Sequence, residues 1–186
     1  MPLNPKVQIK STGIHGHCWF AAADIKQDEH IWWKRPDDEK HTDIFLTRKE
    51  IDALPDDKRL KFLSLCYQVS DDLHCGFDPD LEPIQSELIE DYINHSCCGN
   101  TWYTNPDLLV ASRYIKSGEE ITYDYVMTEA DPTWRLADKC LCGAENCRGN
   151  VTGNDWKIKE LQEKLKGHFF PHVQKKIDDA TKQDQQ

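Results

Sequence analysis

Residues 139–149, KCLCGAENCRG, constrain the fold more than any other stretch because they hold three cysteines close together. A structural zinc site takes four ligands in a tetrahedron. The C-x-C-x4-C spacing of Cys140, Cys142 and Cys147 is tight enough for three thiolates to point at one ion. Three cysteines in so short a run, with glycines beside them, favour a metal site over buried free thiols.

The fourth ligand of this site has to come from a distant segment, because no His or Cys follows within metal-finger distance. The nearest upstream candidates are the neighbouring pair Cys97 and Cys98, and the spacing does not choose between them. Either ligand would pin the C-terminal part of the chain onto the residues near 97. Structural zinc contributes folding energy directly, so it suits an irregular segment of this kind.

Composition and charge predict a soluble, intracellular protein of one domain with appendages. The chain has 186 residues, is 38% hydrophobic and carries a net charge of −10. It has no apolar run near the ~20 residues of a membrane helix, and MPLNPKVQIK lacks the apolar core of a signal peptide. The eight cysteines then read as thiols and metal ligands rather than disulfides. The acidic surface argues against direct nucleic-acid binding and suits a basic partner, unless it serves only solubility.

Local patterns predict short elements of both kinds. We expect strands over residues 7–12, 30–35, 108–114 and 121–126, with HGHC at 15–18 as a turn and a loop over 76–86. Residues 47–75 read as helical, beginning at a capping box of Thr47 and Glu50 and broken at Pro55. Within them, residues 58–69 fit either a helix or a strand.

The C-terminal part of the chain, after Gly153, changes to a helical pattern. Apolar residues spaced along one helix face are Trp156, Ile158, Leu161 and Leu165. Gly167 is placed to end that helix and Pro171 to open another, which carries Val173 and Ile177. The polar end, 178–186, is expected to fray. These helices are a packing extension or else flank a substrate groove.

Three motifs, in this order, resemble a SET domain followed by a post-SET motif: NHSC at 94–97, GEEITYDY at 118–125 and CLCGAENCRG at 140–149. The resemblance runs from about Lys10 to Gly149 and is nearest to small stand-alone SET proteins. It implies a mainly β fold with short helices (α+β), built from small twisted sheets with a knot-like C-terminal crossing. It also implies S-adenosylmethionine-dependent methylation of protein lysines.

The implied organisation has three parts. A SET domain occupies residues 8–126, with an inserted region at about 37–86. A post-SET zinc motif covers residues 136–152, and a helical C-terminal extension with a frayed tail covers 153–186. In this family the Cys of NHSC completes the zinc site, so the resemblance names Cys97, not Cys98, as the partner of the three post-SET cysteines. A second metal site at Cys66, His74 and Cys75 has little support from spacing.

The resemblance assigns catalytic roles to two tyrosines. Tyr125 matches the tyrosine whose hydroxyl lies beside the methyl-transfer site, and Tyr123 matches the position that tunes the product. A hydroxyl at Tyr123 leaves less room for added methyls, which hints at mono- or dimethylation. The alternative for both is a tyrosine on a strand packed in the core.

Cofactor contacts are implied at several positions. Asn94, His95 and Tyr125 match residues that contact S-adenosylmethionine, and Leu141 matches one that packs on its adenine. The first cofactor motif is represented by His15, Gly16 and His17, but Cys18 stands where a second glycine belongs. Glycine there permits close backbone approach. Cys18 is an incidental small residue or, less favoured, a redox switch. Asp28 stands at another usual glycine, in a turn that Asp tolerates.

The sequence therefore predicts an enzyme that transfers a methyl from S-adenosylmethionine to a lysine of a basic protein such as a histone tail. A ribosomal or other non-histone lysine is an alternative substrate. Two further alternatives are a catalytically weak SET module that only binds a partner, and a methyltransferase for another side chain such as histidine. The target lysine must lose its proton before attack, and burial beside a positive sulfonium lowers its pKa from about 10.4. Neither the target nor the oligomeric state is specified.

Overall fold

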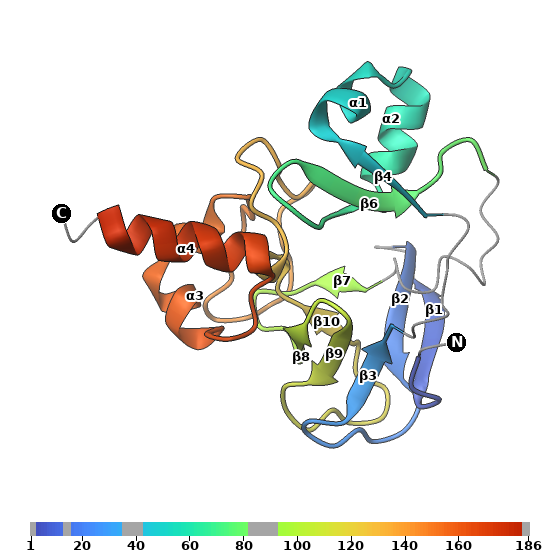
Figure 1. Cartoon of the computed structure of the whole chain (residues 1–186). Helices are drawn as coiled ribbons and strands as arrows, with labels where there is room; N and C mark the ends of the chain where they lie inside the picture. The colour runs from blue at the N-terminus through green and yellow to red at the C-terminus, as the bar shows by residue number, and fades with distance from the viewer. Residues whose placement is uncertain (1–2, 13–15, 35–42, 82–92, 184–186) are drawn as a thin grey trace.

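The strands of the computed structural model form four small sheets within residues 3–12, 16–34, 43–81 and 93–183, which the structure describes (Figure 1). In the first sheet β1 (Val7–Thr12) pairs antiparallel with β2 (Gly16–Ala21). In the second, β9 (Leu108–Ala111) lies between β3 (His30–Trp33) and β8 (Thr101–Asn105). The expected mainly β fold with short helices is confirmed.

A third sheet and two helices form a separate layer, seen at the top of Figure 1. Strand β6 (Leu73–Phe77) lies between β4 (Asp43–Thr47) and β5 (Tyr67–Gln68). Helix α1 (Arg48–Ala53) begins at the predicted capping box, in which the Thr47 hydroxyl accepts from the Glu50 N–H. Pro55 separates it from α2 (Asp56–Leu63), so the run 58–69 is helical at its start and a strand near its end.

The prediction that residues 47–75 are helical is wrong beyond Leu63, because β5 and the start of β6 are strands paired with each other. Other local predictions were also wrong. Residues 16–18 of the predicted HGHC turn lie in β2, where Cys18 pairs with Lys10 and has a fully buried side chain. His15 lies outside the described residues. The predicted loop 76–86 starts later, because β6 continues to Phe77. The tail is helical to Gln183, since the Thr181 hydroxyl donates to the Ile177 carbonyl and Lys175 pairs with Asp179.

The fourth sheet lies at the centre of the molecule and is a short parallel pair. Strand β7 (Asn94–His95) pairs with β10 (Thr122–Tyr123), which brings NHSC beside GEEITYDY. The predicted strand 121–126 ends at Tyr123, because the Asp124 carboxylate accepts the Val126 N–H at 3.1 Å and starts the 3-10 helix η2 (Tyr125–Met127). The knot-like crossing stays a prediction.

The main core fills the space between these sheets. Its fully buried members are contributed by β2, β3, β9 and the segments that follow them, and they include Trp19, Ile25, Ile31, Leu109, Ile115 and Ile121. Ile25 and Ile115 exchange two backbone hydrogen bonds of 2.9 Å, which joins the turn after β2 to the turn after β9. Asp28, which stands where a glycine is usual in a turn, has a φ of 64°, in the left-handed region. Burying each such side chain contributes roughly 1.5–3 kcal/mol.

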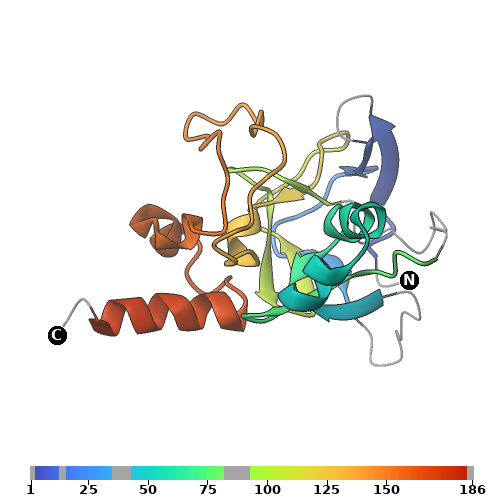
Figure 2. The same ribbon diagram turned by 90° about the horizontal axis from the view of Figure 1, so that it is seen from above.

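The C-terminal extension lies at the opposite end of the molecule from the N-terminal strands, as two views agree (Figures 1 and 2). It contains a 3-10 helix η3 (Asp155–Lys157), α3 (Lys159–Lys164) and α4 (Pro171–Gln183). The predicted apolar face holds in part: Leu161 and Leu165 are buried, and Trp156 packs against the core, while Ile158 is exposed. Gly167 has the positive φ expected of a helix end. No helix in the described part of the chain is long and apolar enough to span a bilayer.

A close approach of two backbones fixes the join between the post-SET segment and the extension. The Gly153 N–H donates to the Trp134 carbonyl at 3.0 Å, and the Leu136 N–H donates to the Val151 carbonyl at 3.0 Å. A Cβ on Gly153 would lie 1.9 Å from the Asp131 carbonyl oxygen. That atom belongs to the backbone, so it cannot rotate away.

Gly153→Ala is therefore expected to destabilise the protein by at least about 3 kcal/mol through steric overlap. Gly167→Ala is the matched control, because its Cβ would meet nothing within 4 Å and only the positive φ is strained. The control should cost about 1–2 kcal/mol. Urea unfolding of both variants measures the difference, and a Gly153→Ala protein as stable as the control would contradict the close approach.

Candidate active site

Four cysteine sulfurs meet just after β7. The Sγ atoms of Cys97, Cys140, Cys142 and Cys147 all lie within 4.8 Å of one another, and no other such group of His, Cys, Asp or Glu occurs among the described residues. The Sγ atoms of Cys97 and Cys140 are 3.9 Å apart. Sulfurs at the corners of a tetrahedral zinc site lie about 3.8 Å apart, given a Zn–S distance of about 2.3 Å. The donor set therefore fits zinc.

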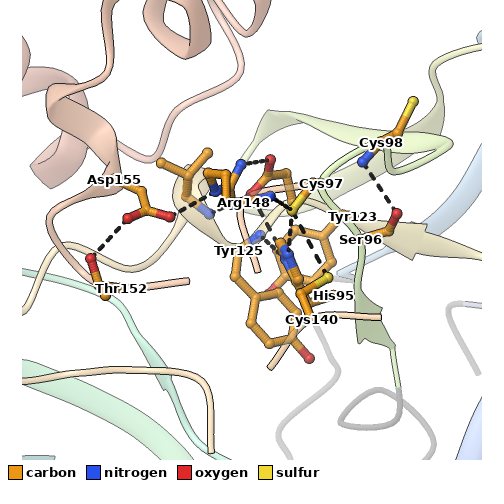
Figure 3. A network of polar contacts seen from close by, with 12 residues as sticks. His95, Ser96, Cys97, Cys98, Tyr123, Tyr125, Cys140, Arg148, Thr152 and Asp155 are labelled. Atoms are coloured by element: carbon orange, nitrogen blue, oxygen red, sulfur yellow. Dashed lines mark hydrogen bonds and ion pairs between the residues drawn. The ribbon is translucent and has the colours of Figure 1, made fainter. Parts of the chain in front are cut away.

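The neighbouring Cys98 does not join this cluster. Its side chain is exposed, and it points away from Cys140 in Figure 3. The backbone N–H of Arg148 donates to the Cys97 sulfur at 3.4 Å, a contact that favours a thiolate. Burial opposes ionisation of Cys142, but the Ala144 N–H and the neighbouring thiols lower its pKa to about 6. Burial raises the pKa of Cys97 to about 12 and also raises the pKa of Cys140, so Cys142 is the thiol of this group that ionises most easily.

His95 connects the cysteine cluster to the segment of the two tyrosines. The Tyr125 N–H donates to His95 Nδ1 at 3.2 Å, so the ring proton lies on Nε2, which faces the Cys97 sulfur at 3.4 Å (Figure 3). Burial lowers the pKa of His95 to about 4, so the ring is neutral at physiological pH. Any shift of the cysteine cluster is therefore transmitted to the backbone of Tyr125.

A buried ion triad lies beside His95. The Arg148 guanidinium forms two bonds of 2.6 and 2.7 Å to the Asp124 carboxylate, and its Nε lies 2.7 Å from Asp155 Oδ2 (Figure 3). The three side chains are 11%, 4% and 9% exposed. Asp124 follows β10, Arg148 follows the last cysteine, and Asp155 opens the C-terminal extension. The triad therefore joins three segments that are distant in sequence.

The side chains of Tyr125 and Tyr123 pack against each other. Their ring centroids are 4.9 Å apart. The Tyr125 hydroxyl donates to the Ile93 carbonyl at 2.9 Å, and the Tyr123 hydroxyl lies 3.5 Å from the Thr128 hydroxyl. Burial raises the pKa of both phenols, so both are neutral and keep oxygen lone pairs for a polarised partner.

Two cavities meet at Tyr125. One, of about 380 Å³, is here called the aromatic cavity; Tyr103, Tyr123, Tyr125, Trp134 and Phe170 are among the residues that line it. The other, of about 520 Å³, is here called the polar cavity; it is lined by Asn94, His95, Glu120, Leu141 and others. Tyr125, Leu136 and Ala137 line both. Such volumes suit a side chain in one cavity and a nucleoside-sized molecule in the other.

The expected cofactor residues are only partly brought together. Asn94, His95, Tyr125 and Leu141 line the polar cavity, and the Leu141 side chain is 78% exposed above it. His17 is half-buried in β2 and is not among the described residues that line this cavity. Gly16 opens the same strand, and His15 lies outside the described residues.

Cys18 touches the site through Asn94. The Asn94 side-chain amide donates to the Cys18 sulfur and to Glu120 Oε1, both at 3.0 Å. Glu120 was missed from the sequence, although it lies inside the GEEITYDY motif. The aromatic wall members Trp134 and Phe170 were missed as well, because no local pattern places them at a cavity.

A family model described as the SET domain matches residues 16–126. This is more than half of the chain, so the protein belongs to the SET-domain family. The chain is 35% identical over 77 residues to the fruit-fly histone-lysine N-methyltransferase ash1. It is 42% identical over 67 residues to SETD1B of Xenopus laevis and 40% identical over 72 residues to fruit-fly Set2, both also named histone-lysine N-methyltransferases. These matches cover 38%, 32% and 35% of this chain and 3% of each relative.

We expect the purified protein to hold one zinc ion per chain, bound by the four clustered cysteines. Cys97→Ser should lose most of the zinc and unfold at a lower temperature, because a structural site with three thiolates is incomplete. Cys98→Ser, the adjacent and exposed cysteine, is the control and should keep both. Atomic absorption and thermal unfolding provide the readouts. Equal zinc loss in the two variants would refute the assignment of Cys97.

Arg148→Met should destabilise the protein by about 3–5 kcal/mol, because it leaves two buried carboxylates without a cation. The control is Arg113→Met, which removes a surface ion pair to Glu119 in which the arginine side chain is 52% exposed. That change should cost about 1 kcal/mol or less. Both are measured by urea unfolding of the zinc-loaded protein. A loss below 1 kcal/mol at Arg148 would show that the triad is not structurally important.

Proposed function

We propose that this protein is a protein-lysine methyltransferase that uses S-adenosylmethionine and acts on a basic protein such as a histone tail. The observation that carries the proposal is the pair of cavities that share Tyr125. A methyl transfer between a sulfonium and an amine needs the two reactants on opposite sides of one point, in line. A nucleoside in the polar cavity and a lysine side chain in the aromatic cavity would meet at this tyrosine.

The residues of the polar cavity suit the proposed cofactor. When bound, S-adenosylmethionine supplies a methyl group on a positive sulfonium. Asn94 and His95 would hold its polar end, and Glu120 would place a negative charge on the same wall. Leu141, exposed between two zinc ligands, would close over the adenine and exclude water. On this proposal the zinc cluster shapes the cofactor site as well as stabilising the fold.

Tyr125 would position the reacting groups rather than react. Its hydroxyl proton is donated to the Ile93 carbonyl, so its oxygen keeps its lone pairs as acceptors, and Tyr125 lines both cavities. Lone pairs there attract the positively polarised groups of the transition state. Catalysis would come from this alignment and from desolvation by the aromatic walls. Tyr123 would narrow the same channel, which favours mono- or dimethylation.

The proposed substrate follows from charge and from the relatives. The chain carries a net charge of −10, which attracts a basic segment. The relatives compared above are named histone-lysine N-methyltransferases, and this supports a histone tail as the first substrate to test. A non-histone basic protein, encountered inside the cell, fits the same chemistry.

A second candidate function is that of a SET module that binds a partner but transfers methyl groups slowly. The observation in its favour is the contact of the Asn94 amide with Cys18 at 3.0 Å, at the position where a glycine was expected. This contact holds the amide against β2, away from a ligand. Reverting Cys18 to glycine should raise the transfer rate if this function is the correct one.

Methyl transfer from radiolabelled S-adenosylmethionine should mark a discrete band in a histone mixture or a whole-cell extract. Tyr125→Phe should lower the rate by roughly 100-fold, the usual effect of removing one preorganised polar group at a transition state. Tyr114→Phe, an exposed tyrosine that lines neither cavity, should leave it unchanged. Mass spectrometry of the band gives the residue and the methyl count. If the zinc-loaded protein labels nothing, the binding module is favoured instead.

A further inference from the structure

Glu129 is the one buried charged group among the described residues that line the aromatic cavity. Two other charged residues line it: Arg135, which is exposed, and Asp43, which is half-buried. Glu129 is 3% exposed, and the rest of the wall is largely aromatic and aliphatic. A carboxyl group this deep in an apolar wall costs several kcal/mol unless a partner satisfies it. Its presence therefore requires an explanation.

One oxygen of the Glu129 carboxyl group, Oε1, has a hydrogen-bond donor within the protein. The Gln68 N–H donates to Glu129 Oε1 at 3.1 Å, and the Gln68 side-chain oxygen accepts the Ala130 N–H at 2.7 Å. The Glu129 N–H donates to the Tyr125 carbonyl at 2.8 Å, which joins its backbone to η2. The position of Glu129 is therefore fixed by β5 on one side and by η2 on the other.

The second oxygen, Oε2, has no hydrogen-bond partner within the part of the chain that the structure describes, although it is buried. Buried polar atoms are almost always paired, so an unpaired one beside a cavity indicates a missing ligand. The Thr128 hydroxyl interacts with the carboxyl group and also lies 3.5 Å from the Tyr123 hydroxyl. Glu129 thus belongs to the polar network at the tyrosines.

Burial raises the pKa of Glu129 to about 7; the Gln68 N–H and the Thr128 hydroxyl oppose this rise, and the charge of Asp131 adds to it. The other ionisable groups around it are Cys66 on the α2–β5 side, Tyr123 and Tyr125 on the β10–η2 side, and His172 of α4, whose Nε2 lies 2.9 Å from the Thr128 carbonyl oxygen. Burial raises the pKa of the thiol and of both phenols and lowers the pKa of His172, so all four stay neutral near pH 7. Glu129 is then the group near the cavity whose charge changes in the physiological range.

We propose that Glu129 Oε2 pairs with the ammonium of the target lysine in the aromatic cavity and accepts its proton before methyl transfer. This inference rests on the proposed function. The N–H bond of the ammonium breaks and an O–H bond forms on Glu129, which leaves a neutral amine and a neutral acid. The amine lone pair then forms the N–CH₃ bond, and the sulfur of the donor retains the electrons of the broken S–CH₃ bond. Glu129 afterwards releases its proton to solvent.

This role explains why the carboxyl group of Glu129 lies in the apolar wall of the aromatic cavity. An ammonium entering an apolar channel loses its hydration, and an opposite charge nearby offsets that loss. Transfer of the proton then removes both charges from the low-dielectric site, so neither remains buried during the attack. A carboxyl group that is neutral or charged near pH 7 can do both, whereas the phenols of Tyr123 and Tyr125 remain protonated.

Glu129→Gln separates this role from a purely structural one. Glutamine has nearly the same shape and keeps an oxygen to accept the Gln68 N–H, so the fold should be retained. The variant should unfold at an equal or higher temperature above pH 7, because ionisation of a carboxyl with a raised pKa destabilises the folded state as pH rises. Glu129→Asp, which keeps the acid but shortens its reach, is the second variant. Asp178→Asn is the control, because Asp178 is an exposed carboxylate on α4 that lines neither cavity and its replacement removes the same unit of charge.

The first test needs no substrate. The full-length, zinc-loaded protein is titrated with n-butylammonium, which has the cationic end of a lysine side chain, and binding is followed by ligand-observed NMR at pH 8. Glu129→Gln should weaken binding by at least about 10-fold, which corresponds to about 1.4 kcal/mol. Asp178→Asn should bind within about 2-fold of the wild type. No binding to the wild type, or equal binding by Glu129→Gln, overturns the proposal.

The second test uses the substrate found by labelling. For the wild type, kcat should rise with pH through about 7, as Glu129 becomes able to accept a proton. In Glu129→Gln, kcat should no longer rise with pH, and its value at pH 7 should fall by roughly 100-fold, a usual contribution of a general base. Glu129→Asp should restore part of the rate and part of the rise of kcat with pH. An unchanged profile in Glu129→Gln overturns the inference about Glu129 while lysine methylation stands. A wild type that labels nothing removes the proposed function instead, and the n-butylammonium result then decides whether Glu129 binds a cation.

Discussion

The buried contact between Arg148 and two carboxylates is the interaction on which the rest of this structure depends. One cation holds Asp124, which ends β10, and Asp155, which begins the C-terminal extension. Charges this deeply buried are costly, and only close, multiple hydrogen bonds offset the loss of hydration. The two hydrogen bonds to Asp124 meet that condition, whereas the contact with Asp155 is an ion pair of 2.7 Å between two atoms that have no hydrogen-bond partner among the described residues. The geometry at Arg148 therefore sets how the post-SET segment and the extension lie against the central strand pair.

The cysteine cluster and His95 extend the same framework to the reacting centre. Cys97 follows β7 directly, so a metal ion bound there fixes the end of the parallel pair. His95 lies between the Cys97 sulfur and the Tyr125 N–H: its Nδ1 accepts the Tyr125 N–H, and its Nε2 faces the Cys97 sulfur as the donor. The Cys97 sulfur, the His95 imidazole and the Tyr125 N–H form one continuous path of polar contacts. This arrangement positions Tyr125 by hydrogen bonding as well as by side-chain packing.

The parts of the molecule that the sequence predicted are those written in short local motifs. Three of the four clustered cysteines (Cys140, Cys142 and Cys147), the capping box at Thr47 and the two tyrosines are all marked by residues close together in the chain. Cys97 was separable from Cys98 only through the family resemblance, because spacing fits both. The extent of β2 and the early end of the strand before Asp124 were mispredicted, since tertiary pairing with β1 and a side-chain cap decided them.

Glu129 and Phe170 could not be predicted as site residues from the sequence, for a different reason. Each lies in a segment with no motif of its own, and each becomes part of the site only when distant elements come together: β5 beside η2 for Glu129, and the extension beside β8 for Phe170. Domain limits and cofactor contacts remain predictions. Long-range packing, not local propensity, determines such residues, so only a structure can indicate them.

The position of Phe170 has a consequence for how the protein is made. This residue lines the aromatic cavity but comes after residue 126, where the match to the SET domain ends. During synthesis on the ribosome, residues 16–126 emerge first and have neither the zinc ligands of the post-SET segment nor this wall. A nascent chain at that stage exposes the apolar surface of a half-built channel. Docking of the last helices, and any metal binding by the cysteines at 140–147, can therefore only come late in synthesis.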